Sequence, residues 1–159
     1  MSRGPSRLGH AAASSLEKIR TIVVDDHQHI ARLVANRIAT LITEKQAAGE
    51  RTVLGLATGS TPIGVYRELI RMHRHEGLSF KGVVTFNLDE YYPMRAESIH
   101  SYRRFMWENL FAHIDIDRRD IHIPQGEVPR EDVDDECRRY EDAIVRAGGI
   151  DFQILGIGK

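Results

Sequence analysis

The chain has 159 residues, of which 42% are hydrophobic and 28% are charged, and its formal net charge at pH 7 is −1. This length and composition predict a soluble protein with room for one α/β domain, and the balanced charge argues against nucleic-acid and membrane partners. The longest apolar runs, such as residues 22–24, are too short to span a bilayer. The single cysteine, Cys137, is expected to be a half-buried helix residue in a reducing, cytoplasmic environment.

The first fifteen residues are small, basic and polar. They lack the apolar stretch of a secretory signal, so residues 1–15 predict a disordered tail, and residues 16–159 carry the pattern of a folded domain.

Short β-rich runs alternate with longer helical stretches along this domain. Strands are expected at residues 20–24, 52–57, 83–87, 121–123 and 151–155, and helices at residues 26–48, 62–75, 101–111 and 130–147. In the first helix an apolar stripe is expected to face the core, formed by Ile30, Leu33, Val34, Ile38, Leu41 and Ile42.

This alternation predicts the fold class, an α/β, three-layer αβα architecture with a mainly parallel, Rossmann-like sheet. Ligands in such folds bind beyond the carboxyl ends of the strands. The segments that follow the predicted strands are therefore the candidates for a site, namely residues 58–61, 88–92 and 156–158.

The first of these segments has the composition of an anion-binding turn, Thr58-Gly59-Ser60-Thr61, and Pro62 follows it. Pro62 suits the first position of a helix, which would make Thr61 the N-cap and leave Gly59 to form the tight turn. Exposed helix N–H groups and the three hydroxyl groups would then form a neutral cradle for a phosphate. The segment matches neither a Walker loop nor a GxGxxG dinucleotide loop, and an ordinary capped turn is the alternative reading.

The second segment contains adjacent carboxylates, Asp89 and Glu90, followed by two tyrosines. Partial desolvation at a strand end raises the pKa of a carboxylate toward the range of a general base. The two side chains point in different directions if the backbone stays extended, so we expect them to have different roles. A solvated acidic turn is the alternative reading.

Together these segments resemble the glucosamine-6-phosphate deaminase (glucosamine-6-phosphate isomerase) family. The similarity runs from about residue 53 to residue 158 through LGLATGSTPIGVYREL, SFKGVVTFNLDEYYPM, SIHSYRRFM, CRRYEDAI and IDFQILGIG. The resemblance implies that Thr58, Gly59, Ser60 and Thr61 contact the sugar phosphate. It also implies that Asp89 moves a proton between the first two sugar carbons, and we place Glu90 with it as a catalytic candidate.

The reaction that the resemblance implies belongs to an enzyme of the hydrolase/deaminase type. Glucosamine 6-phosphate is isomerised and deaminated to fructose 6-phosphate and ammonia, without a metal or an organic cofactor. The family continues beyond the last matched motif with further ring-opening and phosphate-binding residues, and the chain ends at Lys159 before them. We therefore expect residues 16–159 to be an incomplete domain, weakly active or inactive alone, whose full-length form is compatible with a homo-oligomer.

Three alternatives remain open. A 6-phosphogluconolactonase is similar in fold, but its acidic pair is usually followed by arginine, whereas Tyr91 stands here. A sugar-phosphate sensor shares the architecture, but it normally carries a DNA-binding module ahead of it, for which about twenty residues are too few. The segment Thr21-Ile22-Val23-Val24-Asp25-Asp26-His27 resembles the start of a response-regulator receiver, which binds magnesium through an acidic pair.

Other polar and aromatic residues predict structural roles. The histidines are never closer than pairs at i, i+2, which gives no helical metal site. Arg103, Arg104, Arg138 and Arg139 predict solvated helix faces, although Arg103 or Arg104 could approach the phosphate. Three aromatic residues are spaced for a buried helical stripe: Phe105, Trp107 and Phe111.

Overall fold

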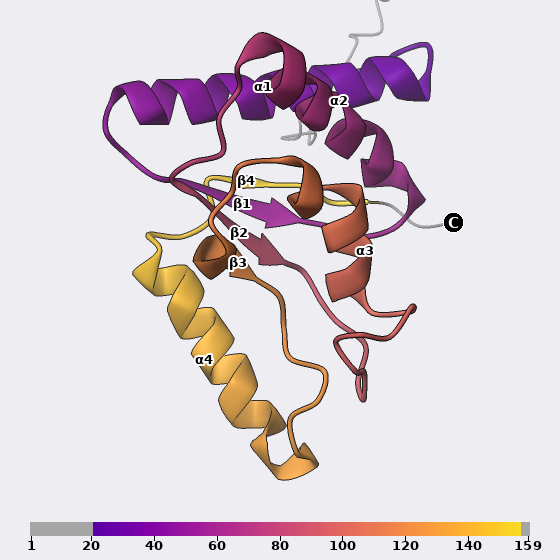
Figure 1. Cartoon of the computed structure of the whole chain (residues 1–159), viewed down its shortest axis with the longest axis vertical. Coiled ribbons are helices and arrows are strands. Elements are labelled where there is room, and N and C mark those ends of the chain that lie inside the picture. Colours follow the sequence, from indigo (N-terminus) through magenta and orange to yellow (C-terminus); the bar gives the residue numbers. More distant parts are fainter. Residues whose placement is uncertain (1–20, 157–159) are drawn as a thin grey trace, which may run out of the picture.

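A parallel four-stranded sheet in the order β3-β2-β1-β4 forms the centre of the protein (Figure 1). The structure is a computed structural model that describes residues 21–156, and the predicted tail, residues 1–15, lies outside them. The strands are β1 (Thr52–Leu56), β2 (Val83–Asn87), β3 (Ile121–His122) and β4 (Phe152–Gln153). The helices are α1 (His27–Ala47), α2 (Ser60–Glu76), α3 (Tyr102–Asn109) and α4 (Val133–Arg146), with short 3-10 turns at η1 (Phe111–His113), η2 (Arg118–Asp120) and η3 (Arg130–Asp132).

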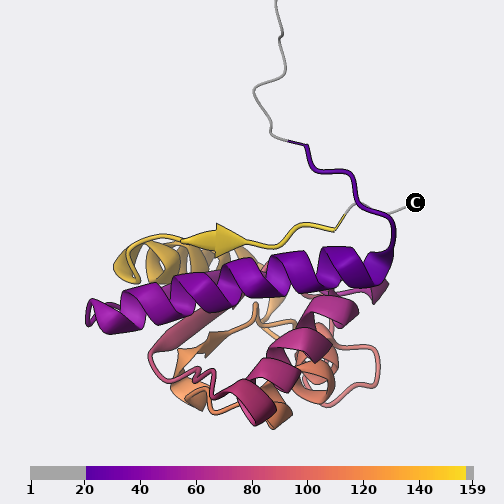
Figure 2. The same cartoon turned by 90° about the horizontal axis from the view of Figure 1, so that it is seen from above.

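The two central strands are buried at every position, because helices cover both faces of the sheet. Figure 2 shows α4 on the opposite side of the sheet from α2 and α3. The main core lies between the sheet and α1, α2 and α3. A smaller cluster under α4 contains Val53, Val84 and Phe86. The predicted three-layer α/β class is therefore confirmed.

The first helix buries a different stripe from the predicted one. Ile38 and Ile42 are fully buried as expected, but Ile30 is 42% exposed and Leu33 is 36% exposed. The other buried positions of α1 are alanines, Ala31 and Ala35. A Cβ atom added to Gly64 in α2 would lie 3.0 Å from the Ala31 Cβ atom, so small residues let these two helices approach closely. The prediction assigned the large apolar side chains of α1 to the core. Close packing against α2 instead buries the small side chains of Ala31 and Ala35.

The helix on the other face is attached by an aromatic side chain. The Tyr140 hydroxyl group of α4 lies 2.8 Å from the Asn87 carbonyl oxygen and 3.1 Å from the His122 carbonyl oxygen. Its ring meets the Phe86 ring edge-on, and Phe86 in turn stacks on His122. Cys137 is exposed on α4, so the prediction of a half-buried cysteine is wrong; only Tyr140, Ala143 and Ile144 of this helix pack against the sheet.

The predicted first strand does not form. Residues 21–24 form neither a helix nor a strand, and Val23 is 91% exposed. Apolar β-branched residues favour extended backbone, yet a strand also needs a neighbour for its hydrogen bonds. The receiver-like reading of this segment loses its first strand, and the Asp26 carboxylate instead caps α1 by accepting from the His29 N–H at 2.7 Å.

The remaining predicted elements are present: β2 has the predicted bounds, α2 is longer at both ends than predicted, and the others are shorter or divided. The helix expected at 101–111 ends at Asn109 and continues as η1, and the helix expected at 130–147 begins as η3. Phe111 is buried, while Phe105 and Trp107 are partly buried against the same core. Within residues 21–156 no helix has both the length and the apolar character needed to cross a membrane.

One carboxylate ties the end of α1 to the sheet. Both oxygens of Asp151 accept hydrogen bonds from the Lys45 ammonium group, at 2.7 and 2.8 Å, and Oδ2 also accepts from the Val53 N–H at 2.8 Å. Partial burial alone would raise the pKa of Asp151, but these hydrogen bonds outweigh it and hold the pKa below its ordinary value of 3.8.

Replacement of this carboxylate tests its contribution to stability. Asp151→Asn should lower the free energy of unfolding by about 1 kcal/mol, because the amide loses the charge that Lys45 binds. The lowered pKa means that the contribution is present above pH 3.8 and is lost as the pH falls through the folded-state value. Denaturant unfolding at pH 7 and at pH 3 measures both effects. If the free energy of unfolding differs between Asp151→Asn and the parent chain by the same amount at the two pH values, this assignment is contradicted. Asp142→Asn, which replaces an exposed carboxylate on α4, is the matched control.

Candidate active site

The carboxyl ends of three strands meet at one rim of the sheet. Leu56, the last residue of β1, pairs with Asn87, the last residue of β2, and the Leu88 N–H donates to the Leu56 carbonyl oxygen at 3.1 Å. On the other side, β4 is parallel to β1, and an added Cβ atom on Gly156 would lie 4.0 Å from the Thr61 Cβ atom. The three segments singled out in the sequence therefore begin at the same edge, although Ile157 and Gly158 lie outside the described residues.

The predicted phosphate loop forms the turn from β1 into α2. Gly59 is the N-cap, with φ of 104°, a conformation that favours glycine. The helix therefore begins at Ser60, and the prediction that Thr61 is the N-cap is wrong. Pro62 is tolerated at the third helical position because the N–H groups of a first turn have no acceptor within the helix. Thr58 is half-buried, whereas Ser60 and Thr61 are exposed.

This turn has free N–H donors, and a buried hydrogen bond holds its backbone in place. Among the described residues no side chain caps the N-terminus of α2, so its first N–H groups are free to bind an anion. Beneath the turn, the buried Tyr66 hydroxyl group donates to the Ala57 carbonyl oxygen at 2.5 Å. Burial raises the pKa of Tyr66, which keeps the phenol protonated as a donor.

Glu90 is used as a cap for the neighbouring helix. Its Oε1 atom accepts from the Tyr91 and Tyr102 N–H groups, both at 2.9 Å, and its Oε2 atom accepts from the Arg103 N–H at 3.0 Å. Ser101 caps the same helix by accepting from the Arg104 N–H at 3.1 Å. The Glu90 carboxylate thus joins the acidic loop to the first turn of α3.

Asp89 has the opposite character. Its carboxylate is exposed, and no hydrogen bond to it occurs within residues 21–156. Partial burial and, after it, the nearby charge of Glu90 raise its pKa above the ordinary value. The adjacent carboxylates therefore differ in their surroundings: Glu90 is fixed by backbone donors, and Asp89 accepts no hydrogen bond among the described residues.

Two tyrosines connect the acidic loop with the phosphate loop. The Tyr91 and Tyr102 rings lie 4.7 Å apart between centroids. The neighbouring Tyr91 side chain, partial burial and the charge of Asp89 raise the pKa of Tyr102 to about 12, while the nearby Thr58 side chain acts in the opposite direction. The Tyr102 phenol consequently lies beside the acidic loop and close to the phosphate loop.

The acidic loop is held from outside by the segment after β3. The Met94 N–H donates to the Gly126 carbonyl oxygen at 2.8 Å, and the Tyr92 hydroxyl donates to the Val128 carbonyl oxygen at 3.1 Å. A Cβ atom on Gly126 would lie 2.6 Å from the Met94 carbonyl oxygen, so only glycine fits without displacement of the loop.

The structure thus places the loops that carry Thr58 and Asp89 on one rim of the sheet, and Glu90 lies in the acidic loop in a capping position. Sequence reasoning noted the aromatic character of the loop but did not single out Tyr102, whose signal was its place directly after the N-cap Ser101. It also missed Asn87, whose buried Oδ1 atom has no partner among the described residues. Within residues 21–156 no three His, Cys, Asp or Glu side chains gather to hold a metal ion.

Several known proteins are similar in sequence over most of this chain. A putative glucosamine-6-phosphate deaminase-like protein of Bacteroides thetaiotaomicron is 45% identical over 91% of this chain and 22% of its own length. Glucosamine-6-phosphate deaminase of Thermoanaerobacter sp. (strain X514) is 44% identical over 88% of this chain and 53% of its own length. The chain thus spans about half the length, or less, of these relatives.

Solved structures agree in fold. A monomeric glucosamine-6-phosphate deaminase superimposes with a TM-score of 0.79 and 41% identity, over 85% of this chain and 54% of that protein. The 6-phosphogluconolactonase of Thermotoga maritima reaches a TM-score of 0.68 at 24% identity, over 85% of this chain and 58% of that protein, which shows a shared fold alone. The family model of glucosamine-6-phosphate isomerases/6-phosphogluconolactonase matches residues 25–159. The chain therefore belongs to the glucosamine-6-phosphate isomerase/6-phosphogluconolactonase family.

Proposed function

We propose that this chain supplies the phosphate-binding turn and the proton-transfer carboxylate of a glucosamine-6-phosphate deaminase. The observation that carries the proposal is the parallel register of β1 and β2, which brings the loop with Thr58 and the loop with Asp89 to one rim of the sheet. The names of the relatives support an enzyme of the isomerase/deaminase kind, and they give no support to the expected hydrolase class. Its product would be fructose 6-phosphate, with release of ammonia.

The phosphate group would bind at the start of α2. Free N–H groups there carry the positive end of the helix dipole, and the Ser60 and Thr61 hydroxyl groups are exposed beside them. This cradle contains no full positive charge, so we expect it to orient a phosphate more than to bind it tightly. With the phosphate fixed, the other end of a single sugar can extend toward the acidic loop on the same rim.

Asp89 would then transfer a proton between the first two carbons of the sugar. A base for this step must be accessible, and Asp89 is exposed. Its raised pKa makes the carboxylate a stronger base than an ordinary aspartate. The phenol of Tyr102 stays protonated at neutral pH, so it can donate to a sugar oxygen or to Asp89.

Glu90 is proposed as a positioning residue. Three backbone N–H groups occupy its oxygens, and their loss on proton transfer would uncap α3. It orients the acidic loop against α3 and, through its charge, contributes to the raised pKa of Asp89.

The second candidate function is that of a 6-phosphogluconolactonase, the other activity in the family description. A lactonase needs to activate water for attack on an ester, whereas a deaminase needs a base that exchanges a proton with carbon. The free carboxylate of Asp89 next to a protonated phenol favours proton exchange with carbon, and therefore the deaminase. We expect a protein of the relatives' full length that contains this sequence to convert glucosamine 6-phosphate and to leave 6-phosphogluconolactone unchanged. Lactonase turnover without ammonia release would reverse the choice.

Removal of the base tests the role of Asp89. In the same full-length protein, Asp89→Asn should lower turnover of glucosamine 6-phosphate by at least about 100-fold, because the amide cannot accept the proton. Binding of the sugar phosphate should change little, since the phosphate turn is intact. Ammonia release measures turnover, and calorimetry measures binding. Loss of binding with retained turnover per bound substrate would reassign Asp89 to recognition.

A second variant tests the positioning role of Glu90. Glu90→Gln should lower stability by about 1 kcal/mol, because the amide oxygen alone cannot accept all three backbone hydrogen bonds. It should also lower the pKa of Asp89, since a neighbouring negative charge is lost, and move the acidic limb of the kcat/KM profile to lower pH.

The pH shift separates the two explanations of this variant. A purely structural cap predicts a loss of stability with an unchanged acidic limb. Glu131→Gln, which removes an exposed carboxylate in η3, is the matched control for the loss of one negative charge.

A further inference from the structure

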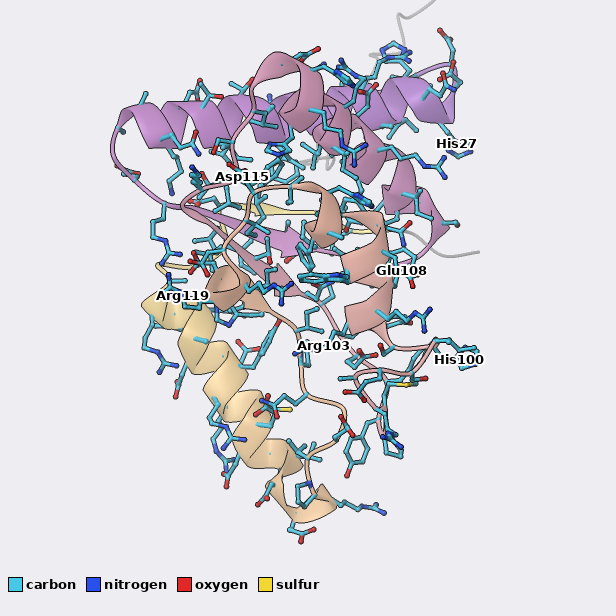
Figure 3. The ribbon with its side chains drawn as sticks, in the orientation of Figure 1. His27, His100, Arg103, Glu108, Asp115 and Arg119 are labelled. Atoms are coloured by element: carbon cyan, nitrogen blue, oxygen red, sulfur yellow. The ribbon has the colours of Figure 1, made fainter. Side chains whose placement is uncertain are left out.

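A cavity of about 540 Å³ lies between α3 and the edge strand β3, and none of its lining residues belongs to the phosphate turn. Arg103 reaches into it from the first turn of α3, on the side that faces β3 (Figure 3). The volume suits a molecule of about one sugar ring, since small-molecule sites in proteins span roughly 300–1,000 Å³. The lining residues are Ala96, Glu97, Arg103, Arg104, Trp107, Phe111, Arg118, Ile121 and Ile123.

Positive charge dominates this cavity. Three arginines and one carboxylate, Glu97, line it. Arg104 is engaged by Glu108 at 2.7 Å, but Arg103 and Arg118 form no ion pair with any residue between 21 and 156. Their neighbour Arg119 shows the contrast, because it is bound by Asp117 at 2.6 Å. Two guanidinium groups therefore line the cavity without an ion-pair partner in the described part of the chain.

An aromatic platform fixes one of these charges. The Arg118 guanidinium carbon lies 4.6 Å from the centre of the Trp107 ring. Such a cation–π contact holds the side chain in place without removing its charge. Ile121, Ile123 and Phe111 supply an apolar wall beside it. The cavity thus combines guanidinium groups, one of which is held against Trp107, with an apolar surface, the usual composition of a site for a small organic anion.

We propose that this cavity is a binding site for a small phosphomonoester, separate from the phosphate turn at the start of α2. Guanidinium groups match the geometry of phosphate oxygens and bind them with charge-assisted hydrogen bonds, which the neutral hydroxyl cradle of α2 lacks. The site also adjoins the acidic loop, because the Arg103 N–H donates to Glu90. This inference does not depend on the reaction proposed above.

Trp107 gives a direct reading of occupancy, because it is the only tryptophan of the chain. Titration of the 159-residue chain with glucose 6-phosphate should change its fluorescence saturably, whereas glucose should not. Arg103→Gln, which leaves the Arg118–Trp107 contact intact, should weaken binding by about tenfold through the loss of one charge-assisted contact. Arg119→Gln is the matched control and should bind like the parent chain.

A double variant, Thr58→Ala with Ser60→Ala, distinguishes this site from the phosphate turn. Fluorescence and calorimetric binding should persist in it and should weaken with added salt. Binding that disappears in the double variant but is unaffected by Arg103→Gln would place the ligand at α2 and overturn the proposal. Absence of saturable binding by both fluorescence and calorimetry would also overturn it.

Discussion

The parallel register between β1 and β2 is the constraint on which the rest of the site depends. Because Leu56 lies opposite Asn87, the segments that follow β1 and β2 leave the sheet at the same level and on the same side. The hydrogen bond from the Leu88 N–H to the Leu56 carbonyl oxygen extends this register by one residue beyond the strand. A shift of one residue would turn every side chain of β2 to the other face and would separate the carboxylate from the phosphate turn.

Around this register the protein divides its polar groups by role. Groups that fix the backbone are saturated: Glu90 by three N–H groups, and the Ala57 carbonyl oxygen by the buried Tyr66 hydroxyl group. Two groups on the open rim have no hydrogen-bond partner among the described residues: the Asp89 carboxylate and the first N–H groups of α2. Rigid surroundings and free reacting groups are the combination expected of a preorganised site.

The fold and the two loops could be predicted from the sequence because each depends on local pattern. Continuous apolar runs specify the buried strands at 52–56 and 83–87, and the order of strand, turn and helix places the loops on one rim. What could not be predicted depends on partners distant in the chain. Nothing local reveals that Ala31 meets Gly64, that Glu90 caps a helix twelve positions later, or that residues 21–24 find no neighbouring strand in the described part of the chain.

The close contact between Gly126 and the acidic loop has a consequence for how the site is built. The loop after β2 cannot complete its shape by itself, because its outer support arrives only when the chain has crossed α3 and β3. The stretch of chain between Met94 and Gly126 is similar in length to the one between the paired residues Thr85 and Ile121, so closing the two loops costs a similar entropy. The support of the Asp89 loop therefore depends on the same crossover from β2 to β3 that adds the edge strand to the sheet.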